Sequence, residues 1–166
     1  MPPGSPARRA EPQSARLAGM LTGALHAAYL AALYRFGLPG TSGPMELRVG
    51  QRNEALHAWL QAGRHHCATV LTAFNPGSRR CSDQMNAAAR LQLRDEVQSR
   101  RLSFIEGQNI DPAGYWPPED SLLIGDLSLA DSRDLAHRFG QLAFLWSDTM
   151  AVPQLHLTAP LDPAQR

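Results

Sequence analysis

The side chains best suited to chemistry fall in three short segments that lie far apart along the chain. They carry carboxyl, amide, hydroxyl and guanidinium groups: Thr72, Asn75, Ser78, Arg79, Arg80, Asn86, Glu119, Ser121 and Gln141. Amides and hydroxyls can orient a ligand, a guanidinium binds anions, and a carboxyl exchanges protons. Together these groups predict a site for an anionic small molecule, of phosphate or nucleotide type.

Glu119 is the candidate catalytic residue. It follows Trp116, Pro117 and Pro118, a stiff and apolar setting in which desolvation would raise the pKa of a carboxyl. The alternative is that Glu119 caps a turn or pairs with an arginine. Whether the protein is an enzyme is left open at this point.

The other candidates also have two readings each. Asn75 precedes a proline, which favours an extended backbone, and its amide either contacts a ligand or forms an Asx-turn. Arg79 and Arg80 form either a solvated loop or an anion site beside a helix N-terminus. Gln141 is expected to be at least half buried, so its amide needs partners, which are either backbone groups or a substrate.

The first segment joins a buried strand to a long helix. Residues 68–74 are apolar and β-prone, and Ser82 is the predicted N-cap of the helix that follows, with Asp83 in its first turn. An apolar stripe at every fourth position predicts the face packed on the sheet: Met85, Ala89, Leu93 and Val97. A second stripe, displaced by about 100°, contains Asn86, Arg90 and Arg94, and its two arginines are expected to face away from the core.

The remaining elements complete one domain. Further strands are predicted over 33–38, 45–49, 102–106, 121–125, 142–146 and 154–158, and further helices over 17–28, from Asn53 to Gly63, and from Ser128 to Phe139. Strand, helix and strand over 68–106 favour a parallel crossover. We therefore predict a single α/β (α+β) domain over 17–158, with a mixed β-sheet of about seven strands packed with three or four helices.

Composition narrows the classes of function. Sixteen basic residues, all of them arginine, against fifteen acidic ones leave a net charge of +1, which gives no strong nucleic-acid or membrane signal. Because the chain has no lysine, it has neither a lysine that could form a Schiff base nor the lysine of a P-loop. Residues 1–16 are rich in arginine and proline and are predicted to be a disordered tail, and 159–166 a loose C-terminal tail.

No cofactor or metal is expected. The chain has no glycine-rich dinucleotide or phosphate-binding pattern, and the neighbouring residues His65, His66 and Cys67 would point to opposite faces of a strand. Cys67 and Cys81 are interpreted as free thiols in a reducing cytoplasm. The oligomeric state cannot be predicted from these patterns.

Three motifs resemble a known family. Residues 72–76 read Thr-Ala-Phe-Asn-Pro and are followed by Ser78, Ser82 and Asn86, residues 116–121 read Trp-Pro-Pro-Glu-Asp-Ser, and residues 139–141 read Phe-Gly-Gln. In this order, over roughly 29–158, they are similar to the bacterial family filed as domain of unknown function 3293. The resemblance implies an uncharacterised bacterial protein and directs attention to a set of positions: Thr72, Asn75, Asn86, Glu119, Ser121 and Gln141.

The three segments can form one site only under a topological condition. Asn75 ends the central strand and Asn86 lies one turn into the next helix, so both belong near the carboxyl end of that strand. Glu119 and Gln141 precede strands, and they reach the same edge only if those strands run antiparallel to the central one. Convergence favours an enzyme or binding protein for an anionic molecule. Scattering favours a non-catalytic interaction module whose polar motifs are structural caps.

Overall fold

The computed structural model describes residues 22–158. Its strands are β1 (Leu33–Phe36), β2 (Met45–Leu47), β3 (Cys67–Thr72), β4 (Phe104–Ile110), β5 (Glu119–Gly125), β6 (Ala143–Asp148) and β7 (Gln154–Leu157). Its helices are α2 (Gly23–Ala31), α3 (Glu54–Gly63), the 3-10 turn η1 (Pro76–Ser78), α4 (Asp83–Ser99) and α5 (Leu129–Arg138). The predicted tails over 1–16 and 159–166, and the first part of the helix predicted over 17–28, lie outside the described residues.

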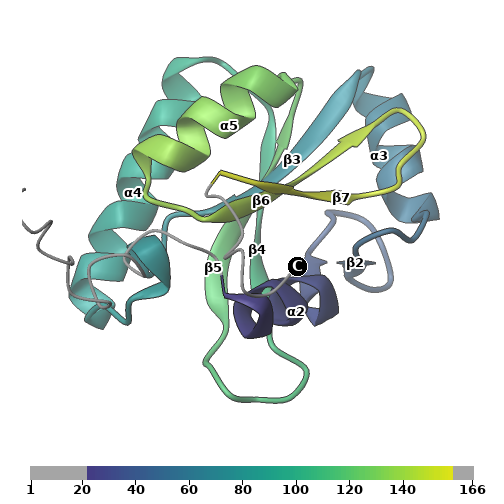
Figure 1. The fold of residues 1–166 in the computed structure, drawn as a ribbon. Helices are drawn as coiled ribbons and strands as arrows, with labels where there is room; N and C mark the ends of the chain where they lie inside the picture. Colours follow the sequence, from purple (N-terminus) through teal and green to yellow (C-terminus); the bar gives the residue numbers. More distant parts are fainter. Residues whose placement is uncertain (1–21, 159–166) are drawn as a thin grey trace, which may run out of the picture.

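All seven strands join one sheet in the order β2-β1-β4-β5-β3-β6-β7 (Figure 1). The predicted α/β class, with about seven strands and four helices, is confirmed over the described residues. The sheet is not mixed, however, because every neighbouring pair in it is antiparallel. β3 and β4 do run in the same direction, as the crossover predicted, but the later strand β5 lies between them and is antiparallel to both.

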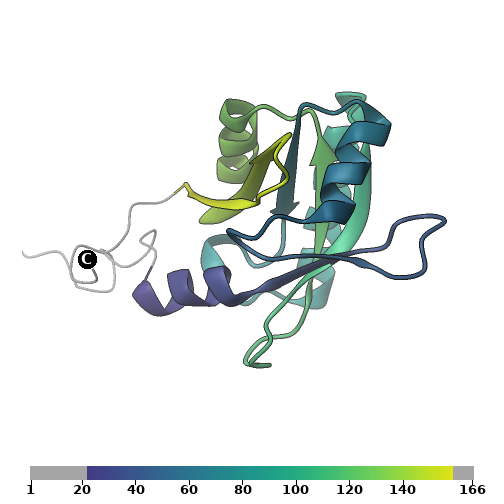
Figure 2. The ribbon, with the colours of Figure 1, turned by 90° about the vertical axis from the view of Figure 1, so that its right-hand side faces the viewer.

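Helices cover both faces of the sheet (Figures 1 and 2). Consecutive strand residues point to opposite faces, so Val70 belongs to the core beneath α3, and Leu71 to the core beneath α4 and α5. Leu123 and Leu122 divide in the same way on β5. Burial on both faces explains why β3 reads as a continuous apolar run, a pattern that sequence reasoning associates with parallel sheets.

The core-facing stripe of α4 differs from the prediction at its first turn. Leu93 and Val97 are buried as expected, but Met85 is 61% exposed and Asn86 is buried. Helical residues advance about 100° each, so Met85 lies roughly 120° around the axis from Val97, whereas Asn86 lies only about 20° from it. A strict four-residue repeat drifts off the buried face, and the polar Asn86 occupies the core-facing position instead.

Helix boundaries follow the predicted caps. The side chains of Asn53, Ser82 and Ser128 each accept a hydrogen bond from the backbone N–H three residues on, at 2.9, 3.2 and 3.1 Å. Gly140 directly follows Phe139, the C-cap of α5, and its φ of +66° is one that glycine adopts without strain. These caps fix where α4 starts and where α5 stops, which are two boundaries of the site described below.

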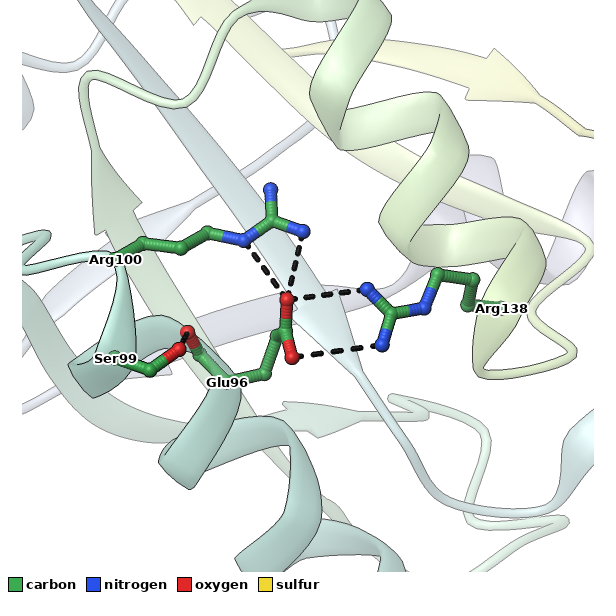
Figure 3. Close-up of polar contacts among 4 residues, drawn as sticks. All are labelled: Glu96, Ser99, Arg100 and Arg138. Carbon is green, nitrogen blue, oxygen red and sulfur yellow. Dashed lines mark hydrogen bonds and ion pairs between the residues drawn. The ribbon is translucent and has the colours of Figure 1, made fainter.

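A charged cluster joins the C-terminal parts of α4 and α5 (Figure 3). The carboxylate of Glu96 accepts hydrogen bonds from Arg100 Nη2 at 2.8 Å and from Arg138 Nη1 at 3.1 Å. Arg138 is the last residue of α5, three positions before Gln141. The cluster therefore ties the end of α5 to α4.

Two further properties concern the helices and the cysteines. Within residues 22–158, no helix has the length and apolar character needed to cross a membrane. Both cysteines are free, Cys67 in the core and Cys81 partly buried at the start of the α4 region, as the sequence predicted.

Candidate functional site

Strand direction brings the three predicted segments to one edge of the sheet. β5 and β6 are each antiparallel to β3, so they start at the edge where β3 ends. The register pairs Thr72 with Ser121, which places Glu119 beside the chain as it leaves β3. Gln141 lies two residues before β6, at the same edge. The topological condition for convergence is therefore met.

A cavity of about 290 Å³ opens at this edge. Its lining combines residues of α2, the β3–α4 connection, the start of α4, the β4–β5 loop, the start of β5 and the turn before β6: Leu25, Tyr29, Phe74, Asn75, Ser78, Arg80, Cys81, Asp83, Asn86, Tyr115, Trp116, Pro117, Pro118, Glu119 and Gln141. Six of the nine side chains selected from the sequence are among them. The volume lies near the lower end of the range for small-molecule sites.

Asn75 is the hub of the hydrogen bonds behind the cavity. Its backbone N–H donates to Asn86 Oδ1 at 2.9 Å, and its own Oδ1 accepts from Asn86 Nδ2 and from the Cys81 N–H, both at 3.0 Å. The two asparagines thus hold each other through two bonds. The expected Asx-turn is absent from the bonds of Asn75, because its oxygen reaches six residues along the chain to Cys81 rather than to the next amides.

The backbone of Asn75 also departs from the prediction. The proline that follows favours an extended conformation, but Asn75 is left-handed, with φ of 47° and ψ of 60°. Asparagine tolerates this region better than most residues do. The conformation turns the chain sharply at the end of β3 and lets the Asn75 side chain bond both Asn86 and Glu119.

Glu119 is the first residue of β5. The prediction had placed it before the strand, which was expected to start at Ser121. The Oε1 of Glu119 accepts a hydrogen bond from Asn75 Nδ2 at 2.6 Å. Burial raises the pKa of the Glu119 carboxyl above its ordinary value of 4.5, and the hydrogen bond from Asn75 opposes part of that rise. A carboxyl with a raised pKa keeps its proton at a higher pH than an exposed glutamic acid, which suits it to exchange protons with a ligand.

Tyr29 closes one side of the cavity, and the sequence patterns did not single it out. Its hydroxyl lies 2.7 Å from Ser78 Oγ, and its carbonyl oxygen accepts a hydrogen bond from the Tyr34 hydroxyl at 3.0 Å. Burial raises the pKa of Tyr29, and the nearby charge of Glu119 raises it further. Tyr29 lies one helical turn after Leu25 on α2, and both residues line the cavity.

Gln141 is only 8% exposed, in agreement with the expectation that it is buried. Its Nε2 donates to the carbonyl oxygens of Phe74 at 3.0 Å and of Phe139 at 3.2 Å. Beside it, the Gly77 N–H donates to the Gly140 carbonyl at 2.7 Å. Backbone groups therefore occupy the amide nitrogen of Gln141 and tie the β3–α4 connection to the turn before β6.

Three predicted residues do not line the main cavity. The Thr72 hydroxyl donates to the Asp120 carbonyl at 2.7 Å and accepts from the Phe74 N–H at 3.1 Å, and Thr72 borders a separate cavity of about 30 Å³ that Glu119 also borders. Ser121 is 3% exposed, and its Oγ makes no hydrogen bond to the described residues. Arg79 is exposed, and unlike its neighbour Arg80 it is not among the residues that line the main cavity.

Charges of both signs line the cavity. Arg80 is its basic residue, while Asp83 and Glu119 are acidic. From the sequence, Asp83 is predicted only to lie in the first turn of a helix and Cys81 only to be a free thiol, so neither was expected in the cavity lining. Within residues 22–158, no group of three His, Cys, Asp or Glu side chains is arranged to hold a metal ion.

Comparison with known proteins finds a similarity to one family, which is described only as a protein of unknown function. Residues 71–144 match the model of a family described as protein of unknown function (DUF3293). The match contains all three motifs on which the resemblance was stated, although it is shorter than the range of 29–158 expected for it. No curated protein and no solved structure matches the chain.

Proposed function

We propose that the cavity binds a small molecule with an anionic group, and that Glu119 exchanges a proton with it. One observation carries the proposal: Arg80, Glu119 and Gln141, which belong to three separate segments of the chain, line a single cavity. Arg80 contacts the anionic group, because a guanidinium offers several donors to a phosphate or carboxylate. The bound molecule is a small metabolite of phosphate or nucleotide type.

Asn75 and Asn86 have a positioning role in this proposal. The amide of Asn86 is used by Asn75, and the amide of Asn75 is used by Asn86, Cys81 and Glu119. Neither side chain needs to touch the ligand. Their function is to hold the Glu119 carboxyl at a fixed place and orientation, which a group that transfers protons requires.

Glu119 makes binding of an anion dependent on protons. Glu119 is neutral when protonated, and burial already favours that form. A bound anion favours it further, because a negative charge nearby disfavours ionisation. Affinity for an anion should therefore rise as the pH falls through the pKa of Glu119, and Glu119→Gln should weaken this dependence.

Arginines at adjacent positions provide a matched test. Ribose 5-phosphate is the probe, and the melting temperature is measured with and without it in the wild type, Arg80→Ala and Arg79→Ala. At ten times the Kd a ligand stabilises by about 1.4 kcal/mol, or roughly 3–6 °C for a domain of this size. The shift should persist in Arg79→Ala and vanish in Arg80→Ala. Equal loss in both variants, or no shift in the wild type, would contradict the proposal.

A second candidate is a non-catalytic interaction module. The mutual bonds of Asn75 and Asn86 support it, since they tie a turn to a helix as structural caps would. Under this alternative, Glu119→Gln would leave the melting-temperature shift with ribose 5-phosphate unchanged at every pH. For either function we infer a cytoplasmic location, because both cysteines are unpaired thiols.

A further inference from the structure

Two large aromatic side chains stand at the rim of the cavity without being buried by the protein. Tyr115 is 84% exposed and Trp116 is 46% exposed, and both line the cavity. They belong to the β4–β5 loop, which projects from the bottom of the molecule in Figure 1 beside α2. Exposed rings grouped at a cavity indicate a surface for contact with a ligand.

Hydrogen bonds and prolines restrict the backbone that carries these rings. The carboxylate of Asp111 accepts hydrogen bonds from the Ala113 N–H at 2.9 Å and from the Tyr115 N–H at 2.8 Å. After Trp116 come Pro117 and Pro118, which restrict the backbone up to the start of β5. Binding of a ligand on these rings therefore loses little conformational entropy of the loop backbone.

Different segments of the cavity lining supply different functional groups. The β4–β5 loop supplies aromatic faces, and the β3–α4 connection supplies the guanidinium of Arg80. Glu119 follows the loop directly, and in its protonated form the carboxyl both donates and accepts hydrogen bonds. Such a group matches the edge of a nucleobase, where donors and acceptors are adjacent.

We infer that the ligand is a nucleoside monophosphate, with its base stacked on Trp116, the edge of the base at Glu119 and its phosphate at Arg80. The inference rests on the function proposed above and specifies its substrate class. Stacking of a base on an aromatic side chain is tolerant of the identity of the base. The structure thus assigns recognition of the phosphate to one loop and recognition of the base to another.

Titration calorimetry with three probes tests this division: adenosine monophosphate, ribose 5-phosphate and adenosine. The wild type should bind the monophosphate roughly 5- to 150-fold more tightly than ribose 5-phosphate, the range expected for one stacked base. Trp116→Ala should remove that advantage and leave ribose 5-phosphate affinity within about 2-fold, while Trp116→Phe should retain most of it. Met150→Ala is the control, because Met150 is 59% exposed and lies between β6 and β7, outside the cavity lining.

The outcomes separate this inference from the proposed function. Equal binding of the monophosphate and ribose 5-phosphate by the wild type would overturn the inference and leave the anion site in place. Equal weakening of both probes by Trp116→Ala would also overturn it, because the side chain would then support the fold rather than the base. Failure of all three probes to bind the wild type would overturn the inference and the proposed function together.

Discussion

At the scale of single residues, the site depends on a partly buried carboxyl that an amide holds in place. Glu119 accepts one hydrogen bond from Asn75 at 2.6 Å, and Asn75 is held in turn by Asn86. Ionising a partly buried carboxyl that accepts only one such bond is costly. The residue that gives the cavity its chemistry therefore also lowers the stability of the fold at neutral pH.

This cost can be measured by replacing Glu119 with glutamine. The folded-state pKa of Glu119 lies above its ordinary value of 4.5, so ionisation destabilises the folded protein as the pH rises through that raised pKa, and the effect is absent below 4.5. Glu119→Gln keeps an oxygen that can accept from Asn75 but cannot ionise. The variant should melt at a higher temperature than the wild type at pH 7–8, with the difference shrinking toward pH 4.

Glu54→Gln provides a control of opposite sign. Its hydrogen bond from Arg52 lowers the pKa of the exposed Glu54 carboxyl, so any contribution to stability is present at neutral pH and is lost as the pH falls below 4.5. A Glu119→Gln variant that loses stability in the same pH range as Glu54→Gln would show that the Glu119 carboxylate is favoured, not penalised, in the folded protein.

The asparagine pair gives a second prediction at this scale. Asn86 is 6% exposed, and its removal leaves the Asn75 N–H without its side-chain partner. Asn86→Ala should therefore lower the free energy of unfolding by about 1–3 kcal/mol, as measured by urea denaturation. Gln92→Ala, at an exposed position of the same helix, should change it by less than about 0.5 kcal/mol. Similar values for the two variants would mean that the Asn75–Asn86 bonds contribute little.

At the scale of elements, local signals predicted more than periodicity did. Asn53, Ser82 and Ser128 cap their helices as expected, because a cap depends only on the next three residues. The prediction of the buried face of α4 was wrong at Met85. A stripe of every fourth residue drifts around the helix axis by about 40° per step, so its first member leaves the buried face. Asn75 was expected to be extended, but its contacts with Asn86 and Glu119, which are distant in sequence, determine its conformation.

The corrected face of α4 predicts unequal effects of two apolar truncations. Leu93 is 2% exposed, so Leu93→Ala should cost about 2–5 kcal/mol of unfolding free energy. Met85 is 61% exposed, and Met85→Ala should cost less than about 0.5 kcal/mol. Chemical denaturation of both variants measures the difference. A large loss in Met85→Ala would restore the originally predicted stripe.

The cluster of Figure 3 makes a smaller contribution that depends on pH. Hydrogen bonds from Arg138 and Arg100 lower the pKa of Glu96 below its ordinary value of 4.5. Its stabilisation is therefore present above pH 4.5 and is lost as the pH falls through the lowered pKa. Because these side chains are partly solvated, Glu96→Gln should cost only about 1 kcal/mol or less at pH 7, and salt should reduce the loss. A loss that is unchanged at pH 3 would contradict the ionic origin.

At the scale of the whole molecule, the order of strands creates the cavity, and this was the part least accessible from the sequence. From the sequence it follows that the three segments converge only if β5 and β6 run antiparallel to β3. The sequence does not establish that these strands do so. Insertion of β5 between β3 and β4 depends on pairing across the whole sheet. Tyr29 joins the site for the same reason, since α2 reaches Ser78 only in the folded molecule.

The central claim is that three separated segments form one binding site for an anion. Its most direct measurement is the change in backbone amide chemical shifts of the isotopically labelled protein during titration with ribose 5-phosphate. The amides of Arg80, Glu119 and Gln141 should shift together with one Kd, while that of His65, at the opposite edge beside Asp126, should not. Shifts confined to one segment, shifts with different Kd values, or shifts centred on the His65 edge would contradict the account.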